Sequence, residues 1–208
     1  MSAVQEAILV HSKRLPEGTV LAPKSLLHLG SRAAVDQALS RMARRGELLR
    51  VSRGRYVRPR QTRFGPRAPS VHEVAARFSR TTGETIVPSG AQEAHSLGLT
   101  SQVPIRTVYL TSGPNRRLEL GKQDLEFRKA PSWKLSGPGT KEGAVMRAVE
   151  WMGREVPQEA VERAVSSLQP EERQRLLQAC AAAPTWLARR LTRAVFPEPP
   201  GDERVDRG

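Results

Sequence analysis

The stretch "SRAAVDQALSRMARRGELLRVSRGRYVRP", Ser31 to Pro59, joins a helical pattern to a hairpin pattern and decides the fold of the N-terminal third. Ser31 is a favourable N-cap and Gly46 a favourable C-terminal stop, so a helix is predicted between them. At about 100° per residue, one stripe of this helix is apolar and the opposite stripe is short, polar and basic. The apolar stripe comprises Val35, Ala38, Leu39 and Met42. The outer stripe comprises Ala33, Gln37, Ser40 and Arg44, with Arg41 at its margin.

The second half of the stretch alternates apolar and basic residues around a glycine. Gly54 supplies the positive φ that a tight hairpin connection needs. The apolar positions that pair are Leu48 or Leu49 and Val51 before the turn, and Tyr56 and Val57 after it. The basic side chains left for solvent or phosphate are Arg50, Arg53, Arg55 and Arg58.

The residues before Ser31 complete a recognisable order of elements. The pattern predicts an amphipathic helix from about Val4 to Leu15, a short extended stretch at Thr19–Leu21, and a brief helix at Pro23–Leu29 closed by Gly30. Helix, short strand, helix, third helix and basic ribbon is the order of a winged helix-turn-helix. In that geometry the third helix enters the major groove, and the ribbon follows the backbone or the neighbouring minor groove.

The distribution of charge points to the same third of the chain. The protein has 208 residues, 34 Lys and Arg against 21 Asp and Glu, and a net charge of +13. Met1 to Arg67 holds 14 basic and 4 acidic residues, a net of +10 that leaves +3 for the remainder. Such an excess favours an anionic polymer or surface as partner.

These patterns assign DNA contacts to two groups of side chains, with Arg45 as a further DNA-binding residue at the helix end. The residues predicted to read bases are Gln37, Ser40, Arg41 and Arg44. The residues predicted to hold the phosphate backbone are Arg32, Arg50, Arg53, Arg55 and Arg58. Two alternatives remain: the charge run is only a solvated face, or the winged helix mediates protein contacts.

The rest of the chain predicts an α+β organisation. Residues 61–69 lie in a proline-rich and arginine-rich segment without periodicity, which is typical of a linker that can also follow a groove. "SVHE" at Ser70 has capping-box spacing, and Ser89 with Gln92 caps another helix. Three strands are expected between Arg106 and Ala130, the last two joined by a turn at 121–123. From Thr140 onward the pattern is helical, with boundaries at Pro157, Pro170 and Pro184.

A second stretch, "PSGAQEAHSLGLTSQVPIRTVYLTSGPNRRLELG" (Pro88 to Gly121), carries a family resemblance together with Ser31–Pro59. The chain resembles the antitoxin of AbiE-type (abortive-infection, type IV) toxin-antitoxin systems, in particular the small proteins with an N-terminal winged helix. The likeness spans about Val4 to Ala130 and is weaker in the C-terminal helices. The expected organisation is a winged helix-turn-helix at 1–60, a linker at 61–69, an antitoxin domain at 70–196 that ends in helices, and a disordered tail at 197–208.

The resemblance implies a cytoplasmic bacterial protein whose N-terminal domain binds inverted repeats in its own promoter. Its C-terminal domain would counteract a nucleotidyltransferase-like toxin encoded next to it, and the two proteins need not form a stable complex. No catalytic residue carries over from the antitoxin family. Arg116 and Arg117, beside a Gly-Pro turn, are candidates to face the toxin or RNA, although two arginines at an exposed turn are common.

A search for enzymatic chemistry finds little. The four histidines have no metal-ligand spacing, and the sequence predicts neither a metal nor another cofactor. Asp124, Glu126 and Lys129 faintly suggest a nuclease, but their spacing differs from the usual acid-x-Lys element and fits exposed charges on a half-buried strand. The protein is expected not to be an enzyme. The alternatives are a winged-helix nuclease and a stand-alone transcriptional regulator.

Cysteine usage and hydropathy indicate the compartment in which the protein is expected. The single cysteine, Cys180, excludes an internal disulfide and lies on an apolar helical stretch, so we expect it to be a buried small hydrophobe. Trp133, Trp151 and Trp186 are also expected in the core, although an exposed tryptophan could anchor a partner. No signal sequence and no apolar run of membrane-spanning length is present, so a cytoplasmic protein without a membrane partner is expected.

Overall fold

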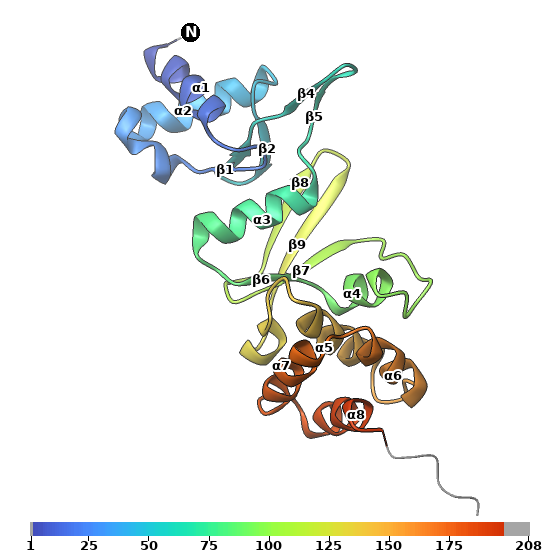
Figure 1. Ribbon diagram of the computed structural model, residues 1–208. Coiled ribbons are helices and arrows are strands. Elements are labelled where there is room, and N and C mark those ends of the chain that lie inside the picture. The colour runs from blue at the N-terminus through green and yellow to red at the C-terminus, as the bar shows by residue number, and fades with distance from the viewer. Residues whose placement is uncertain (1, 198–208) are drawn as a thin grey trace, which may run out of the picture. The chain divides into compact units, whose positions relative to one another are not determined.

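The computed structural model describes residues 2–197 and shows an α+β fold (Figure 1). The chain divides into two compact units. Unit 1 comprises the residues up to Val87 together with Ile105–Ala130, and unit 2 comprises Pro88–Pro104 together with the residues from Pro131 onward. Each unit is therefore built from two separate pieces of sequence. The expected tail at 197–208 lies outside the described residues except for Pro197.

Unit 1 begins with the helices that the sequence predicts. α1 (Ala3–Arg14) is followed by the 3-10 helix η1 (Pro23–Leu29) and by α2 (Arg32–Arg44). Ser31 caps α2 by accepting a hydrogen bond from the Ala34 amide at 3.3 Å. The apolar stripe of α2 is buried with side chains from α1 and η1, so the amphipathic pattern defines the core. The fully buried members of this cluster are Ile8, Leu26, Val35, Leu39 and Met42.

A small sheet follows α2. β2 (Leu49–Ser52) and β3 (Arg55–Val57) form the expected hairpin, and Gly54 at its turn has φ 67°. β1 (Val20–Leu21) pairs antiparallel with β3, so the strand order is β1-β3-β2. The extended stretch predicted at Thr19–Leu21 is thus the third strand of this sheet.

The segment expected to be a linker is a second hairpin. β4 (Arg60–Thr62) and β5 (Gly65–Arg67) pair antiparallel, and in Figure 1 they project from the rest of unit 1. Thr62 closes the turn, because its hydroxyl donates to the Gly65 carbonyl at 2.8 Å and accepts from the Phe64 amide at 3.2 Å. The linker prediction was wrong. Strands are recognised in a sequence by alternating apolar residues, and this hairpin is held by local hydrogen bonds without such alternation.

The remainder of unit 1 is one helix and a four-stranded sheet. α3 (Val71–Thr82) has the expected capping box, in which Ser70 and Glu73 bond reciprocally. The sheet has the order β6-β7-β9-β8, with β7 parallel to β9 and β8 antiparallel to β9. The strands are β6 (Ile86–Pro88), β7 (Thr107–Thr111), β8 (Arg116–Leu120) and β9 (Gln123–Lys129). The three strands predicted after Arg106 are therefore confirmed.

One apolar core joins the two sheets of unit 1. Val51 and Val57 of the first sheet share a cluster with Val74 and Phe78 of α3 and with Phe127 of β9. The boundary of the compact units consequently does not coincide with the boundary expected at 60–70, because α3 covers apolar residues on both sides of it.

Unit 2 is mainly helical, and its prolines start helices as predicted. Pro157 and Pro184 are N-caps, and Pro170 is a first-turn residue. The helices are α4 (Gly90–Ser96), η2 (Ser132–Leu135), α5 (Lys141–Met152), α6 (Gln158–Ser166), α7 (Pro170–Cys180) and α8 (Thr185–Val195). Cys180 is buried as expected, and burial raises the pKa of its thiol. Trp133 and Trp186 pack against the helical core, but Trp151 is 43% exposed and is not a core residue.

A buried ion pair fixes the middle of α5 against α4. Arg147 of α5 donates to Glu93 of α4 and also to the Ser136 carbonyl at 2.9 Å. The two helices approach so closely that a Cβ on Gly90 would lie 2.3 Å from the Arg147 carbonyl oxygen. Arg147 therefore holds α4 and the loop before α5 in one arrangement.

Candidate nucleic-acid interface

The outer face of α2 is polar because its apolar side is used by the core. Gln37, Arg41 and Arg44 are exposed, and Ser40 is half-buried. Their separation by three or four residues places them along one side of the helix. All four residues predicted to read bases therefore lie on the outer face of α2, three of them exposed and Ser40 half-buried.

A groove lies between the N-terminal half of α2, η1 and the β2–β3 hairpin. It has a volume of about 630 Å³. Its charged and polar lining comes from Lys24, Arg32, Asp36, Ser40, Arg50, Arg53 and Arg55. The same groove brings together five predicted DNA-binding residues from α2 and the hairpin: Arg32, Ser40, Arg50, Arg53 and Arg55.

The charge of the groove is only partly neutralised. Arg32 Nε lies 2.8 Å from the Asp36 carboxylate, and both side chains are exposed. This pair leaves Lys24, Arg50 and Arg53 as exposed cations around the groove. Sequence reasoning missed Lys24. The available signal was its position directly after Pro23 at the start of a short helix, where a lysine has no core role.

Two predicted contacts have other partners. Arg55 lines the groove, but its guanidinium lies over the Phe78 ring at 5.6 Å. Burial and the nearby positive charge of Arg116 lower the pKa of Arg55. Arg45 binds Glu47 through Nε at 2.8 Å and Nη2 at 3.2 Å. Arg55 is therefore held by an aromatic ring, and Arg45 already has a carboxylate.

Arg58 lies elsewhere. It lines a small hollow with Pro16, Gly18 and Thr19, next to the turn between α1 and β1. The groove beside α2 does not include it. β3 ends at Val57. The alternation of side chains along the strand therefore does not extend to Arg58, and the sequence pattern could not predict the direction of its side chain.

Arg116 and Arg117 line one open hollow together with Asn115 and Glu126, but each has its own carboxylate partner. Arg116 donates to both Glu84 oxygens, at 2.6 and 2.7 Å, and its side chain is only 16% exposed. The Arg116 guanidinium is therefore already bound by a carboxylate of unit 1, and a contact of Arg116 with a toxin or RNA stays a prediction. Arg117 is 59% exposed and pairs with Asp124 at 2.7 Å. The two follow one another along β8, so they point to opposite faces.

The predicted strand around Asp124 and Glu126 is confirmed as a half-buried strand. Leu125 and Phe127 are buried, and Glu126 pairs with Arg128 at 2.7 Å. Within residues 2–197, no group of three His, Cys, Asp or Glu side chains could hold a metal ion.

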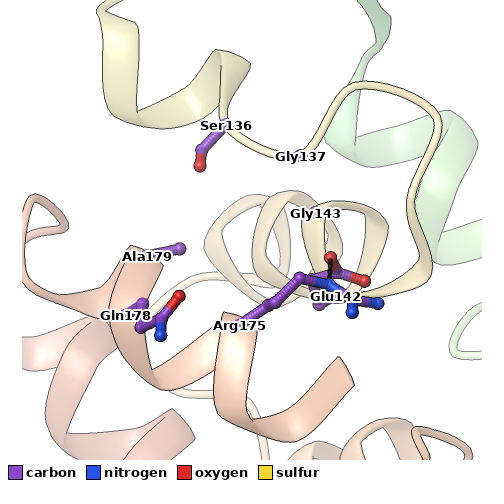
Figure 2. Close-up of a pocket in the computed structure, with 7 residues that line it drawn as sticks. All are labelled: Ser136, Gly137, Glu142, Gly143, Arg175, Gln178 and Ala179. Carbon is purple, nitrogen blue, oxygen red and sulfur yellow. Dashed lines mark hydrogen bonds and ion pairs between the residues drawn. The ribbon is translucent and has the colours of Figure 1, made fainter. Parts of the chain in front are cut away.

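Unit 2 has an open pocket of its own, shown in Figure 2. It has a volume of about 350 Å³ and lies between the loop before α5, the first turn of α5, and α7. Arg175 Nε donates to Glu142 Oε1 at 2.7 Å, whereas Glu142 Oε2 is buried and has no hydrogen-bond partner among the described residues. Burial alone would raise the pKa of Glu142, but the hydrogen bond from Arg175, with smaller contributions from Thr140 and the backbone, keeps this pKa low.

The close approach of the preceding loop to α5 explains why glycines line this pocket. A Cβ on Gly143 would lie 2.3 Å from the Gly137 carbonyl oxygen, so the loop can approach α5 only at glycine. The pocket has a single carboxylate, and that carboxylate is bound to an arginine.

Residues 7–177 match the profile of DUF6088, which is described as a family of unknown function. The chain belongs to the DUF6088 family. No curated protein matches this DUF6088 sequence.

This DUF6088 member is similar in fold to the RV2827C protein from Mycobacterium tuberculosis, which has a crystal structure. The two share 14% identity with a TM-score of 0.54, and the match covers 94% of this chain and 77% of the other. A likeness at this level of identity concerns the fold alone. In the part of the chain that the structure describes, no helix is long and apolar enough to span a membrane.

Proposed function

We propose that residues 1–60 form a winged helix-turn-helix that binds duplex DNA. The order α1, β1, η1, α2, β2, β3 and the sheet order β1-β3-β2 support this proposal. The observation that carries it is the basic groove, in which the polar face of α2 and the arginines of the β2–β3 hairpin lie together. An α-helix fits the major groove, and a basic ribbon beside it contacts the backbone.

The exposed side chains have separate roles in this arrangement. Gln37, Arg41 and Arg44 lie on the open face of α2, where they can reach base edges. Lys24, Arg50 and Arg53 surround the groove and bind phosphates. Arg55 holds the hairpin on Phe78 and so positions Arg53 without contacting DNA itself.

We further propose that the protein is the antitoxin of a toxin-antitoxin system and represses its own operon. The resemblance of Ser31–Pro59 and Pro88–Gly121 to AbiE-type antitoxins supports this step. In this proposal unit 1 binds inverted repeats in the promoter, and unit 2 counteracts a nucleotidyltransferase-like toxin. The protein acts in the cytoplasm and without catalysis of its own.

A binding titration tests the DNA step. Purified protein is titrated by gel shift against the region upstream of its gene and against a scrambled duplex of equal length, at two salt concentrations. A preference for the upstream DNA that persists at the higher salt supports the proposal. Equal, salt-sensitive binding to both duplexes would leave only general affinity for polyanions and would contradict sequence-specific repression.

Coexpression tests the antitoxin step. The neighbouring gene is induced in cells with and without this protein, and growth is followed. The proposal requires that growth stops when the neighbour is expressed alone and recovers when this protein is present. Recovery by a variant with Arg50 and Arg53 replaced by Ala would separate neutralisation from repression of the operon.

A further inference from the structure

The β4–β5 hairpin, Arg60 to Arg67, forms an arm with an exposed aromatic ring at its tip. Thr62 pairs with Gly65, so the connecting loop consists of Arg63 and Phe64 alone. Phe64 is 70% exposed. This ring at the tip of a projecting hairpin has no place in the apolar core and is open to contact with a partner.

The arm lies within a segment that contains no carboxylate. The residues from Leu48 to His72 include seven arginines and neither Asp nor Glu. Three of these arginines, Arg60, Arg63 and Arg67, belong to the arm and are exposed. Its partner should therefore carry negative charge along an extended surface.

The pairing of the arm places like charges opposite each other. Arg60 and Arg67 are direct cross-strand partners, an arrangement that destabilises a hairpin by itself. Glu17 offsets this repulsion only in part, since its carboxylate lies 3.6 Å from Arg60 Nε and both side chains are about half exposed. A phosphate backbone beside the arm would relieve the remaining repulsion.

Two guanidinium groups also lie close to the exposed ring. Arg63 lies over Phe64 at 4.7 Å from the ring centroid, and Arg67 lies over it at 5.5 Å. These contacts hold the ring and the cations together at the tip. The tip thus combines an apolar wedge with flanking positive charges, the pair of features that minor-groove proteins use to unstack and kink a duplex.

The width of the arm decides how it meets DNA. The minor groove of B-DNA is about 6 Å wide. The axes of two paired strands are already about 4.8 Å apart, so the ribbon is wider than the groove once its backbone and side-chain atoms are included. Only the tip side chains can enter it. Phe64 can therefore reach a base step while Arg63 and Arg67 remain at the level of the phosphates.

We propose that the β4–β5 arm is a second DNA contact, in which Phe64 inserts into the minor groove between two base pairs and Arg63 and Arg67 bind the flanking phosphates. This inference rests on the proposed DNA-binding function and adds to it a deformation of the duplex. The bound DNA is unstacked at one step. Its bases there become accessible to reagents that attack unstacked thymines.

The test compares Phe64→Ala with the wild-type protein on the DNA fragment upstream of its gene. Affinity is measured by gel shift at two salt concentrations, and unstacking is measured by permanganate oxidation of thymines in the complex. Phe196→Ala is the matched control, because Phe196 is 64% exposed and lies in unit 2.

The wild type and Phe196→Ala are expected to produce thymines with raised permanganate reactivity at the bound site. Phe64→Ala should lose this reactivity and bind about tenfold more weakly, as expected when an aromatic ring that stacks on a base is truncated. Its dependence on salt should stay unchanged, because no phosphate contact is lost. Arg63→Ala should instead lower the slope of log K against log salt by about 0.9.

The failure of this inference differs from the failure of the proposed function. If Phe64→Ala binds and unstacks as the wild type does while Arg53→Ala binds more weakly, the arm is not a DNA contact and the proposed function stands. If the wild type shows no preference for its upstream DNA, the proposed function fails and the inference fails with it.

Discussion

Arg147 and Glu93 form an ion pair in the interior of unit 2, with Arg147 Nη2 2.9 Å from Glu93 Oε1. Arg147 is only 2% exposed. Its remaining donors bind the carbonyls of Ser136 and Lys134, so one guanidinium joins α4, η2 and the loop before α5. This pair holds together the two separate sequence pieces of unit 2.

Removal of one partner of this pair should be costly. Glu93→Ala leaves Arg147 buried without a counter-charge, and we expect the free energy of unfolding to fall by about 3 to 5 kcal/mol. Urea denaturation followed by circular dichroism measures this change. Glu159→Ala, at an exposed position of α6, is the control and should change stability by less than about 0.5 kcal/mol. A loss for Glu93→Ala no larger than that of the control would contradict the structural role of the pair.

Truncation of the hairpin cations should weaken DNA binding without affecting sequence preference. Arg53→Ala and Arg50→Ala each remove one exposed cation beside the groove. Each should reduce the slope of log K against log salt by about 0.9, and by a similar amount on specific and scrambled duplexes. Arg189→Ala, an exposed arginine of α8, is the matched control. Equal slopes for all three variants and the wild type would show that the hairpin does not contact phosphate.

Substitutions on the open face of α2 should act on specificity. Gln37→Ala and Arg44→Ala are expected to reduce discrimination between the upstream and scrambled duplexes by about 1 to 3 kcal/mol, the range for a lost bidentate base contact. Competition gel shifts with both duplexes measure this ratio directly. If these variants weaken both duplexes equally, α2 follows the backbone and does not read bases.

The stability of unit 1 should depend on pH through Glu84. The hydrogen bond from Arg116 holds the pKa of Glu84 below its ordinary value, with a smaller contribution from Thr111 against the effect of burial. Because the carboxyl has the lower pKa in the folded state, its contribution to the free energy of unfolding is full above about pH 4.3 and declines as the pH falls through the folded pKa.

Glu84→Gln checks this dependence. The variant should be less stable than the wild type at pH 7, and its free energy of unfolding should decline less steeply below pH 4.3. Urea titrations at several pH values between neutrality and about pH 3 provide the comparison. A parallel decline in both proteins would mean that other carboxyl groups govern the acid sensitivity.

Local signals were sufficient to predict most helices and strands. The caps Ser31 and Ser70, and the prolines 157, 170 and 184, mark helix starts that the structure confirms. These signals depend on backbone groups only a few residues away, so they can be recognised in a single sequence. The strand that contains Leu125 and Phe127 was predicted in the same way, from alternation.

The side-chain partners could not be predicted from the same signals. Arg116 binds Glu84, which is 32 residues away, and Arg55 lies on Phe78 of α3. Both contacts depend on how α3 covers two sheets, and periodicity does not contain that information. Lys24 reaches the groove through a non-local contact as well, because the sheet in which β1 pairs with β3 brings η1 beside the hairpin.

The alternation of the two units along the chain has a consequence for synthesis on the ribosome. The chain leaves unit 1 after Val87, returns to it at Ile105 and leaves it again after Ala130. The sheet of unit 1 therefore cannot close until β9 has emerged, by which time α4 has already been exposed without α5 to cover it. A nascent chain that stalls between these points has two unfinished cores, and no single cut in the sequence separates the two units from each other.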